Sequence, residues 1–230
     1  MRTTFVSGLV DLLLPVQCVG CGSNAGTLCP GCRPVTPPRE ADHGGLVVRA
    51  AASYQGGIRA ALVAYKEHGR RDLAGPLAEL LGGAVDAARG GARVVLVGVP
   101  TGRAAARARG GDHVARLVAL VARGSGLPRA QPLRQVRPVR DSAALGVAAR
   151  RLNVAGSMAA EPACHSEVAL LIDDIVTTGS TLLEARRALL AAGWPVAGAA
   201  VVAATPRGPG AHPVHSPSPG TRTGTGLAWV

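Results

Sequence analysis

The chain has 230 residues, of which 47% are hydrophobic and only 2% aromatic, and its net charge is +11. This length allows one medium-sized α/β domain with a small appendage, and the core must be built from Ala, Val and Leu. Arginine carries the basic charge, since Lys66 is the only lysine, and the charge favours phosphates, pyrophosphate or nucleic acid as partners. The shortage of aromatic side chains argues against a single-strand-binding protein, because base stacking needs them.

The first apolar stretch of the chain, residues 5–16, is interrupted by Ser7, Gly8 and Asp11 and is too short to cross a bilayer. It also lacks the small-residue cleavage site of a signal peptide. We therefore expect a short helix over residues 5–14, no membrane span, and a cytoplasmic protein.

Four cysteines follow in the pattern C-x2-C-x7-C-x2-C: Cys18, Cys21, Cys29 and Cys32. Each x2 spacing lets two thiolates converge on one ion, and four thiolates suit tetrahedral Zn²⁺ in a closed structural site. A pair of disulfides and an iron–sulfur cluster are the alternatives. We expect a minimal zinc ribbon without a catalytic role, and a structural or incidental role for the isolated Cys164.

Composition divides the chain into three parts. Residues 1–38 hold the short helix and the cysteines, and Pro34, Pro37 and Pro38 mark an extended linker. Residues 39–205 form the main domain. Residues 206–230 are rich in Pro, Gly, Ser and Thr and are predicted to be a disordered tail.

The main domain alternates between predicted strands and helices. Strands are predicted over residues 46–53, 93–99, 168–172 and 196–203, and helices over 58–68, 73–88, 113–123 and 182–192. Asp112 is placed to cap the helix at 113–123. Residues 133–139 are predicted to be extended over the site, and residues 141–151 to form a helix or a mobile lid.

Basic side chains gather near the end of the helix predicted over residues 58–68. Lys66, Arg70 and Arg71 surround Gly69, and packing alone does not account for them. Their charge suits the C-terminal end of the helix dipole, which leaves a structural and a functional interpretation open.

A second basic segment follows the strand predicted over residues 93–99. Thr101 and Gly102 come first, and then Arg103, Arg107 and Arg109. The backbone at Gly102 can approach an anion while the guanidinium groups neutralise it, which is typical of a pyrophosphate loop. A solvated basic loop is the alternative.

The most informative segment, residues 168–181, reads VALLIDDIVTTGST. Its apolar run predicts a strand buried on both faces of a parallel sheet, with Asp173 and Asp174 at the carboxyl end, where open α/β sheets bind ligands. Adjacent carboxylates repel each other and need hydroxyl donors or a cation. The vicinal hydroxyls of a ribose supply donors, and Mg²⁺ supplies charge.

A short hydroxyl-rich loop comes directly after this strand. It consists of Thr177, Thr178, Gly179, Ser180 and Thr181. Successive backbone N–H groups, a flexible glycine and the positive end of the following helix form an anion nest sized for a phosphate. An alternative is a plain capping box, since Glu184 lies three residues after Thr181.

The segment 168–181 resembles the signature for phosphoribosyl pyrophosphate (PRPP) of type I phosphoribosyltransferases. Over residues 10–205 the chain resembles the ComF family of competence-associated phosphoribosyltransferase-like proteins. The motifs are CVGCG…CPGC, YQGGIRAALVAYKEHG, VGVPTGRAAARARGGDHVARL, VRDSAALGVAARRLNVAGSM and LLIDDIVTTGSTLLEA. The cysteine module ahead of the PRPP signature distinguishes this family from nucleotide-salvage enzymes.

The resemblance implies a type I phosphoribosyltransferase fold: a parallel sheet of about five strands with flanking helices, a hood and a small N-terminal zinc ribbon with four cysteine ligands. It implies that Asp173 and Asp174 hold the ribose of Mg²⁺-PRPP, that residues 177–181 hold the 5′-phosphate, and that Arg103 meets pyrophosphate. The implied activity is phosphoribosyl transfer with release of pyrophosphate, linked to DNA uptake. The alternative is a non-catalytic uptake factor that contacts single-stranded DNA or the uptake machinery and has a regulatory or vestigial PRPP site.

The chain departs from the family pattern after the basic loop. Gly111, Asp112 and His113 stand where the family often has an aromatic residue, Asn and Gln. The resemblance therefore assigns these three positions no substrate contact. Further along, it keeps four polar residues as candidates near the site: Arg137, Arg140, Asp141 and Asn153.

Overall fold

A computed structural model describes residues 16–33, 37–102, 111–139, 147–163 and 167–206. The predicted N-terminal helix and almost all of the predicted tail lie outside these ranges. The same is true of Arg103, Arg107, Arg109, Arg140, Asp141 and Cys164. Among the described helices, none has both the length and the apolar character needed to cross a bilayer.

The centre of the molecule is a mostly parallel sheet with the strand order β1-β2-β8-β7-β3-β4. The bounds are β1 Arg39–Asp42, β2 Val47–Ser53, β3 Val95–Gly98, β4 Arg129–Ala130, β7 Ala169–Val176 and β8 Val196–Ala204. From β2 to β4 all neighbours run parallel, whereas β1 pairs antiparallel with β2. The expected parallel sheet of about five strands is therefore present, with an additional edge strand directly after the proline-rich linker.

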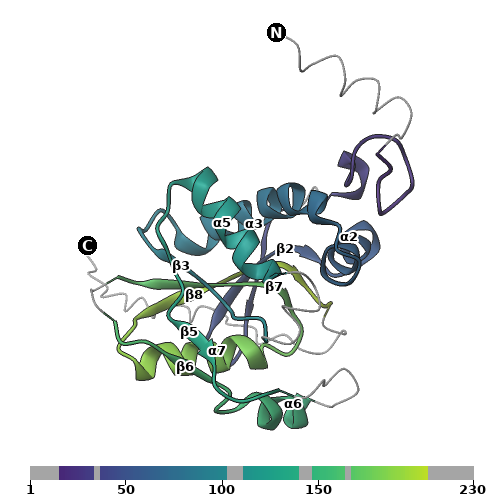
Figure 1. The fold of residues 1–230 in the computed structure, drawn as a ribbon. Coiled ribbons are helices and arrows are strands. Elements are labelled where there is room, and N and C mark those ends of the chain that lie inside the picture. The colour runs from purple at the N-terminus through teal and green to yellow at the C-terminus, as the bar shows by residue number, and fades with distance from the viewer. Residues whose placement is uncertain (1–15, 34–36, 103–110, 140–146, 164–166, 207–230) are drawn as a thin grey trace, which may run out of the picture.

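Helices cover both faces of this sheet (Figure 1). One face carries α2 Gly56–Glu67, α3 Ala74–Arg89 and α5 His113–Ser125, and the other carries α7 Ser180–Ala191. Alternating residues of each strand supply the two cores, because successive strand side chains point to opposite faces. Leu170 and Ile172 pack under α3 and α5, whereas Leu171 packs under α7. The apolar run of β7 is thus buried on both sides, as its sequence predicts.

A small antiparallel unit lies on the α7 side of the sheet (Figure 1). It consists of β5 Leu133–Gln135 and β6 Met158–Ala160, with α6 Val147–Val154 between them in the chain. Arg137, a predicted site candidate, donates instead to the carbonyls of Asn153 and Ala155, at 3.1 and 2.6 Å. Its guanidinium therefore closes the end of α6.

The cysteine segment is packed directly against the start of α2. It contains the short 3₁₀ turn η1 Pro30–Cys32. A Cβ placed on Gly57 would lie 2.6 Å from Cys32 Cβ and 3.1 Å from the Cys32 carbonyl oxygen. Arg33 also reaches Glu79 of α3 at 2.7 Å. The segment is thus attached to both α2 and α3.

This close approach predicts opposite effects for two glycine substitutions. Gly57→Ala should destabilise the protein by about 1–3 kcal/mol, because the new methyl group overlaps Cys32. The control is Gly83→Ala, in the middle of α3, where a Cβ meets no described atom within 4 Å. It should stabilise by about 0.5–1 kcal/mol, because alanine favours the helix. Urea unfolding of both variants measures this, and a neutral Gly57→Ala would contradict the packing.

Candidate functional site

The acidic pair lies within β7, close to its carboxyl end. The strand continues to Val176, so the prediction that it ends at Ile172 was wrong: Asp173 and Asp174 both take part in it. As neighbours on a strand they point to opposite faces. Asp173 is half-buried, whereas Asp174 is only 3% exposed. The two carboxylates therefore have different environments.

Asp174 is held by two donors from the helical layer. Lys66 Nζ, near the end of α2, lies 2.8 Å from Asp174 Oδ2. His113 Nε2, the first residue of α5, lies 2.8 Å from the same oxygen. Tyr65 supports the imidazole, because its hydroxyl donates to the His113 carbonyl at 2.9 Å and its ring meets the His113 ring edge-on. Both donors thus contact the same oxygen, Oδ2, of this buried carboxylate.

These contacts give the two carboxyl groups opposite acidities. Burial opposes ionisation of Asp174, but the His113 hydrogen bond and the Lys66 charge outweigh it and hold its pKa below the usual value. Burial and the neighbouring charge of Asp174 raise the pKa of Asp173 well above its usual value. Asp174 is therefore the member of the pair that stays ionised.

Sequence reasoning missed both partners of Asp174. For Lys66, the sequence left both a structural and a functional interpretation open, and His113 was given no role. His113 lies 61 positions and Lys66 lies 108 positions before Asp174 in the sequence, so no local spacing connects them to it. The one available signal was compositional, because Lys66 is the only lysine.

The hydroxyl-rich loop closes the carboxyl end of β7 and starts α7. The helix begins at Ser180, two residues before the predicted start, and its N-cap is Gly179 with φ +78°. The Thr178 and Ser180 hydroxyls lie 2.9 Å apart. Gly179 has no side chain to cap this helix, and the Thr178 hydroxyl accepts from the Ser180 N–H at 3.4 Å. Glu184 instead accepts from the Met158 N–H at 3.0 Å, so the capping-box alternative was wrong.

A histidine from the far edge of the sheet packs against this loop. His43 lies in the turn between β1 and β2 and is buried. A Cβ placed on Gly179 would lie 2.6 Å from His43 Nδ1. Arg186 of α7 donates to the Gly45 carbonyl at 3.0 Å and holds the same turn. Gly179 is thus required both for its left-handed backbone and for this close approach.

The predicted pyrophosphate segment is described only for Thr101 and Gly102. Thr101 donates from its N–H and its hydroxyl to Asp112, both at 3.2 Å, and its Oγ1 lies 3.5 Å from His113 Nδ1. Asp112 also accepts from the Ala115 N–H at 3.0 Å, which confirms it as the cap of α5. His113 therefore connects this segment to Asp174.

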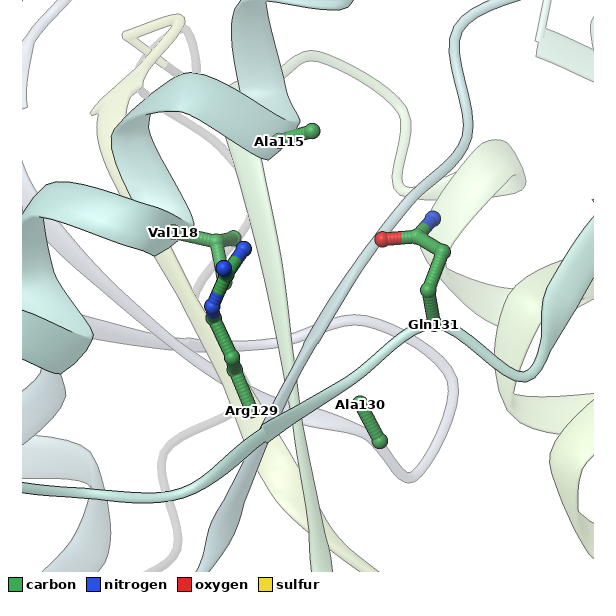
Figure 2. Close-up of a pocket in the computed structure, with 5 residues that line it drawn as sticks. All are labelled: Ala115, Val118, Arg129, Ala130 and Gln131. Atoms are coloured by element: carbon green, nitrogen blue, oxygen red, sulfur yellow. The ribbon is translucent and has the colours of Figure 1, made fainter.

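A pocket of about 270 Å³ lies beside these residues, between α5 and β4 (Figure 2). Its lining is Ala115, Val118, Arg129, Ala130 and Gln131. Figure 2 shows the Arg129 and Gln131 side chains extending from the β4 segment toward α5. Neither the acidic pair nor the loop at residues 177–181 lines this pocket, so it is separate from the candidate site.

The four cysteines of the N-terminal segment converge. Their sulfur atoms all lie within 4.8 Å of one another, and those of Cys21 and Cys29 are 3.5 Å apart. Four thiolates around one tetrahedral ion need separations of about 3.8 Å, so the cluster can hold a metal ion. The backbone N–H groups of Gly20 and Cys29 point at the Cys18 sulfur, at 3.4 and 3.3 Å.

Two of these thiols have pKa values shifted in opposite directions. Burial opposes ionisation of Cys18, but the surrounding backbone N–H groups prevail and lower its pKa to about 6. Burial and the neighbouring thiols raise the pKa of Cys32 to about 12. Such a cluster is unfavourable as four bare thiolates and needs a cation to balance it.

The site combines an asymmetric acidic pair, a loop of hydroxyls at a helix N-terminus, and a second loop joined to them through His113. Carboxylates can accept from sugar hydroxyls, and the N–H groups can bind a phosphate. No protein-family model matches the chain, and no curated protein matches it.

The contact between His43 and Gly179 predicts a larger cost at this glycine than at a comparable one. Gly156 also has positive φ, at +69°, but a Cβ there meets no described atom within 4 Å. Gly156→Ala should cost about 1–2 kcal/mol from backbone strain alone. Gly179→Ala should cost about 1–3 kcal/mol more, because the methyl group overlaps His43. Equal losses in thermal or urea unfolding would contradict the contact.

Proposed function

We propose that this protein binds PRPP, or a related ribose 5-phosphate, at the carboxyl end of β7. One observation carries the proposal: the groups that a phosphorylated sugar needs follow one another along a short segment of the chain. A buried parallel strand leads into two carboxylates, and a Thr/Gly/Ser loop then starts α7. This order supports recognition of a phosphorylated sugar, because the carboxylates that can accept from sugar hydroxyls lie next to the loop that can bind a phosphate.

Each part of the ligand has a corresponding group in the chain. The half-buried Asp173 accepts from the ribose hydroxyls, and Asp174 stands behind it. The N–H groups and hydroxyls of residues 177–181 bind the 5′-phosphate. Mg²⁺ enters with the pyrophosphate as part of the substrate and neutralises its charge, and Thr101 and Gly102 lie on that side.

The reaction that such a site supports is phosphoribosyl transfer. The bond between the anomeric carbon and pyrophosphate breaks, and an acceptor nucleophile forms the new bond while pyrophosphate leaves. The protein contributes orientation and charge stabilisation rather than covalent chemistry. The ComF resemblance adds a proposed link to DNA uptake in the cytoplasm.

The described arginines favour a small phosphorylated ligand over nucleic acid as the direct partner. Several are already paired within the protein, although a nucleic-acid surface needs charges that are free to meet phosphates. The pairs are Arg33–Glu79, Arg49–Glu40, Arg70–Asp72, Arg89–Asp86 and Arg187–Glu184. These five arginines are thus already neutralised within the protein.

For the cysteine cluster we propose structural Zn²⁺. Four sulfur donors satisfy this ion without an open position, and N–H groups directed at Cys18 are suited to a metal-bound thiolate. The cluster packs on the start of α2, far along the helix from Lys66, so its role is to hold that helix rather than to react.

Calorimetry with Mg²⁺-PRPP tests the proposed ligand. The wild-type protein should bind it, and Asp173→Asn should weaken binding at least about tenfold, because one of the two oxygens that face the ribose hydroxyls is replaced by an NH₂ group that cannot accept a hydrogen bond. The matched control is Asp86→Asn, which removes an exposed carboxylate of α3 and should leave the affinity unchanged. Absence of binding by a folded wild type would overturn the proposal. Release of pyrophosphate with any of a panel of bases would establish transfer, and binding without release would favour a regulatory site.

Metal analysis tests the cluster. The purified protein should contain one Zn²⁺ per chain, and Cys18→Ser should lose it, because three thiolates no longer close the site. Cys164→Ser is the matched control and should keep the ion. Iron in place of zinc, or an unchanged metal content in Cys18→Ser, would refute a zinc site built from the four cysteines.

A further inference from the structure

The basic residues of this chain are distributed unequally between lysine and arginine. Of its 25 basic side chains, 24 are arginine and one is Lys66. That one lysine is the residue whose ammonium group lies 2.8 Å from the buried Asp174. A sequence that uses arginine at every other basic position thus has its one lysine ammonium group at the candidate site.

The surroundings of Asp174 explain why a compact cation suits this place. Oδ2 also receives His113 Nε2 at 2.8 Å, and Tyr65 stands edge-on to that imidazole. An ammonium group can share one oxygen with a second donor, whereas a planar guanidinium is built to take both oxygens of a carboxylate. Lys66 and His113 therefore share Oδ2 and together fix the orientation of the Asp174 carboxylate.

Lys66 is also placed differently from an ordinary buried partner. Its side chain is 23% exposed, compared with 5% for Asp174, so it extends from solvent down to the carboxylate. Several charged or titratable groups surround this contact: Tyr65 on α2, Asp112, His113 and Arg116 on α5, and Asp173 on β7. Lys66 and His113 come from two helices and meet at a single atom of β7.

We propose that Lys66 is a positioning residue of the PRPP site, which holds the Asp174 carboxylate by Oδ2 behind Asp173, the residue that accepts from the ribose hydroxyls. This inference rests on the proposed function and deepens it, since it gives Lys66 a task in ligand binding. A purely structural ion pair would stabilise the fold without any effect on ligand affinity. The two roles are therefore separable by experiment.

The single lysine provides an NMR probe whose signal needs no resonance assignment. Protein labelled with ¹³C at the lysine ε-carbon should give one ¹H–¹³C signal for this chain. Asp174→Asn should shift that signal, because the ammonium loses its anionic partner, whereas Asp86→Asn should not. Mg²⁺-PRPP should shift it in the wild type, and Mg²⁺ alone should not. An unchanged signal in folded Asp174→Asn would overturn the ion pair and the proposal with it.

Calorimetry of Lys66 variants supplies the second test. Lys66→Met should bind Mg²⁺-PRPP at least about tenfold more weakly, because truncating one member of a buried charge pair releases the other. Lys66→Arg should recover part of the affinity. Arg59→Met, which removes an exposed charge from the same helix, should bind like the wild type. In a double-mutant cycle, Lys66→Met and Asp174→Asn should be strongly non-additive.

The outcomes separate this inference from the proposed function. If the wild type does not bind Mg²⁺-PRPP, both the proposed ligand and the positioning role fail. If the wild type binds and folded Lys66→Met binds equally well, only the positioning role fails. Equal affinities of Lys66→Arg and Lys66→Met, both weak and both folded, would contradict a role for the charge.

Discussion

A nearly inaccessible carboxylate at the carboxyl end of β7 governs the arrangement around it. Asp174 stays ionised there only because Lys66 and His113 reach the same oxygen. A buried charge that loses one partner costs about 3–5 kcal/mol, so the two donors and the strands beneath them must form together. This requirement holds the end of α2 and the start of α5 against β7. It also brings the Thr101 loop alongside, since the other side of the His113 ring faces Thr101.

Helix α2 connects the two chemically distinctive parts of the molecule. Gly57 at its start contacts Cys32, and Lys66 near its end contacts Asp174. A metal ion among the cysteines would hold the surface on which the first turn of α2 rests. The position of the Lys66 ammonium is therefore linked, through a helix of 12 residues, to the folding of the cysteine segment. This gives the N-terminal module a structural task that does not require it to touch the ligand.

Local chemistry explains which features were predictable from the sequence. The apolar run of β7, the loop that follows it and the Asp112 cap each depend on residues close together in the chain, and all three are present. The strand β1 was not predicted, because an edge strand gains its stability from the neighbouring β2 rather than from its own pattern. The alternative of a local cap by Glu184 was wrong, because its partner Met158 lies on a different element. The contacts of Lys66, His113 and His43 were beyond prediction for the same reason: they arise only when distant segments meet.

We propose that the acidic pair and the loop at residues 177–181 bind one ribose phosphate together. A crystal structure of the protein with Mg²⁺-PRPP tests it most directly. We expect the 5′-phosphate on the backbone N–H groups of residues 178–181 and the ribose hydroxyls within hydrogen-bond distance of Asp173. PRPP bound elsewhere on the protein, with these groups unchanged and unoccupied, would contradict it.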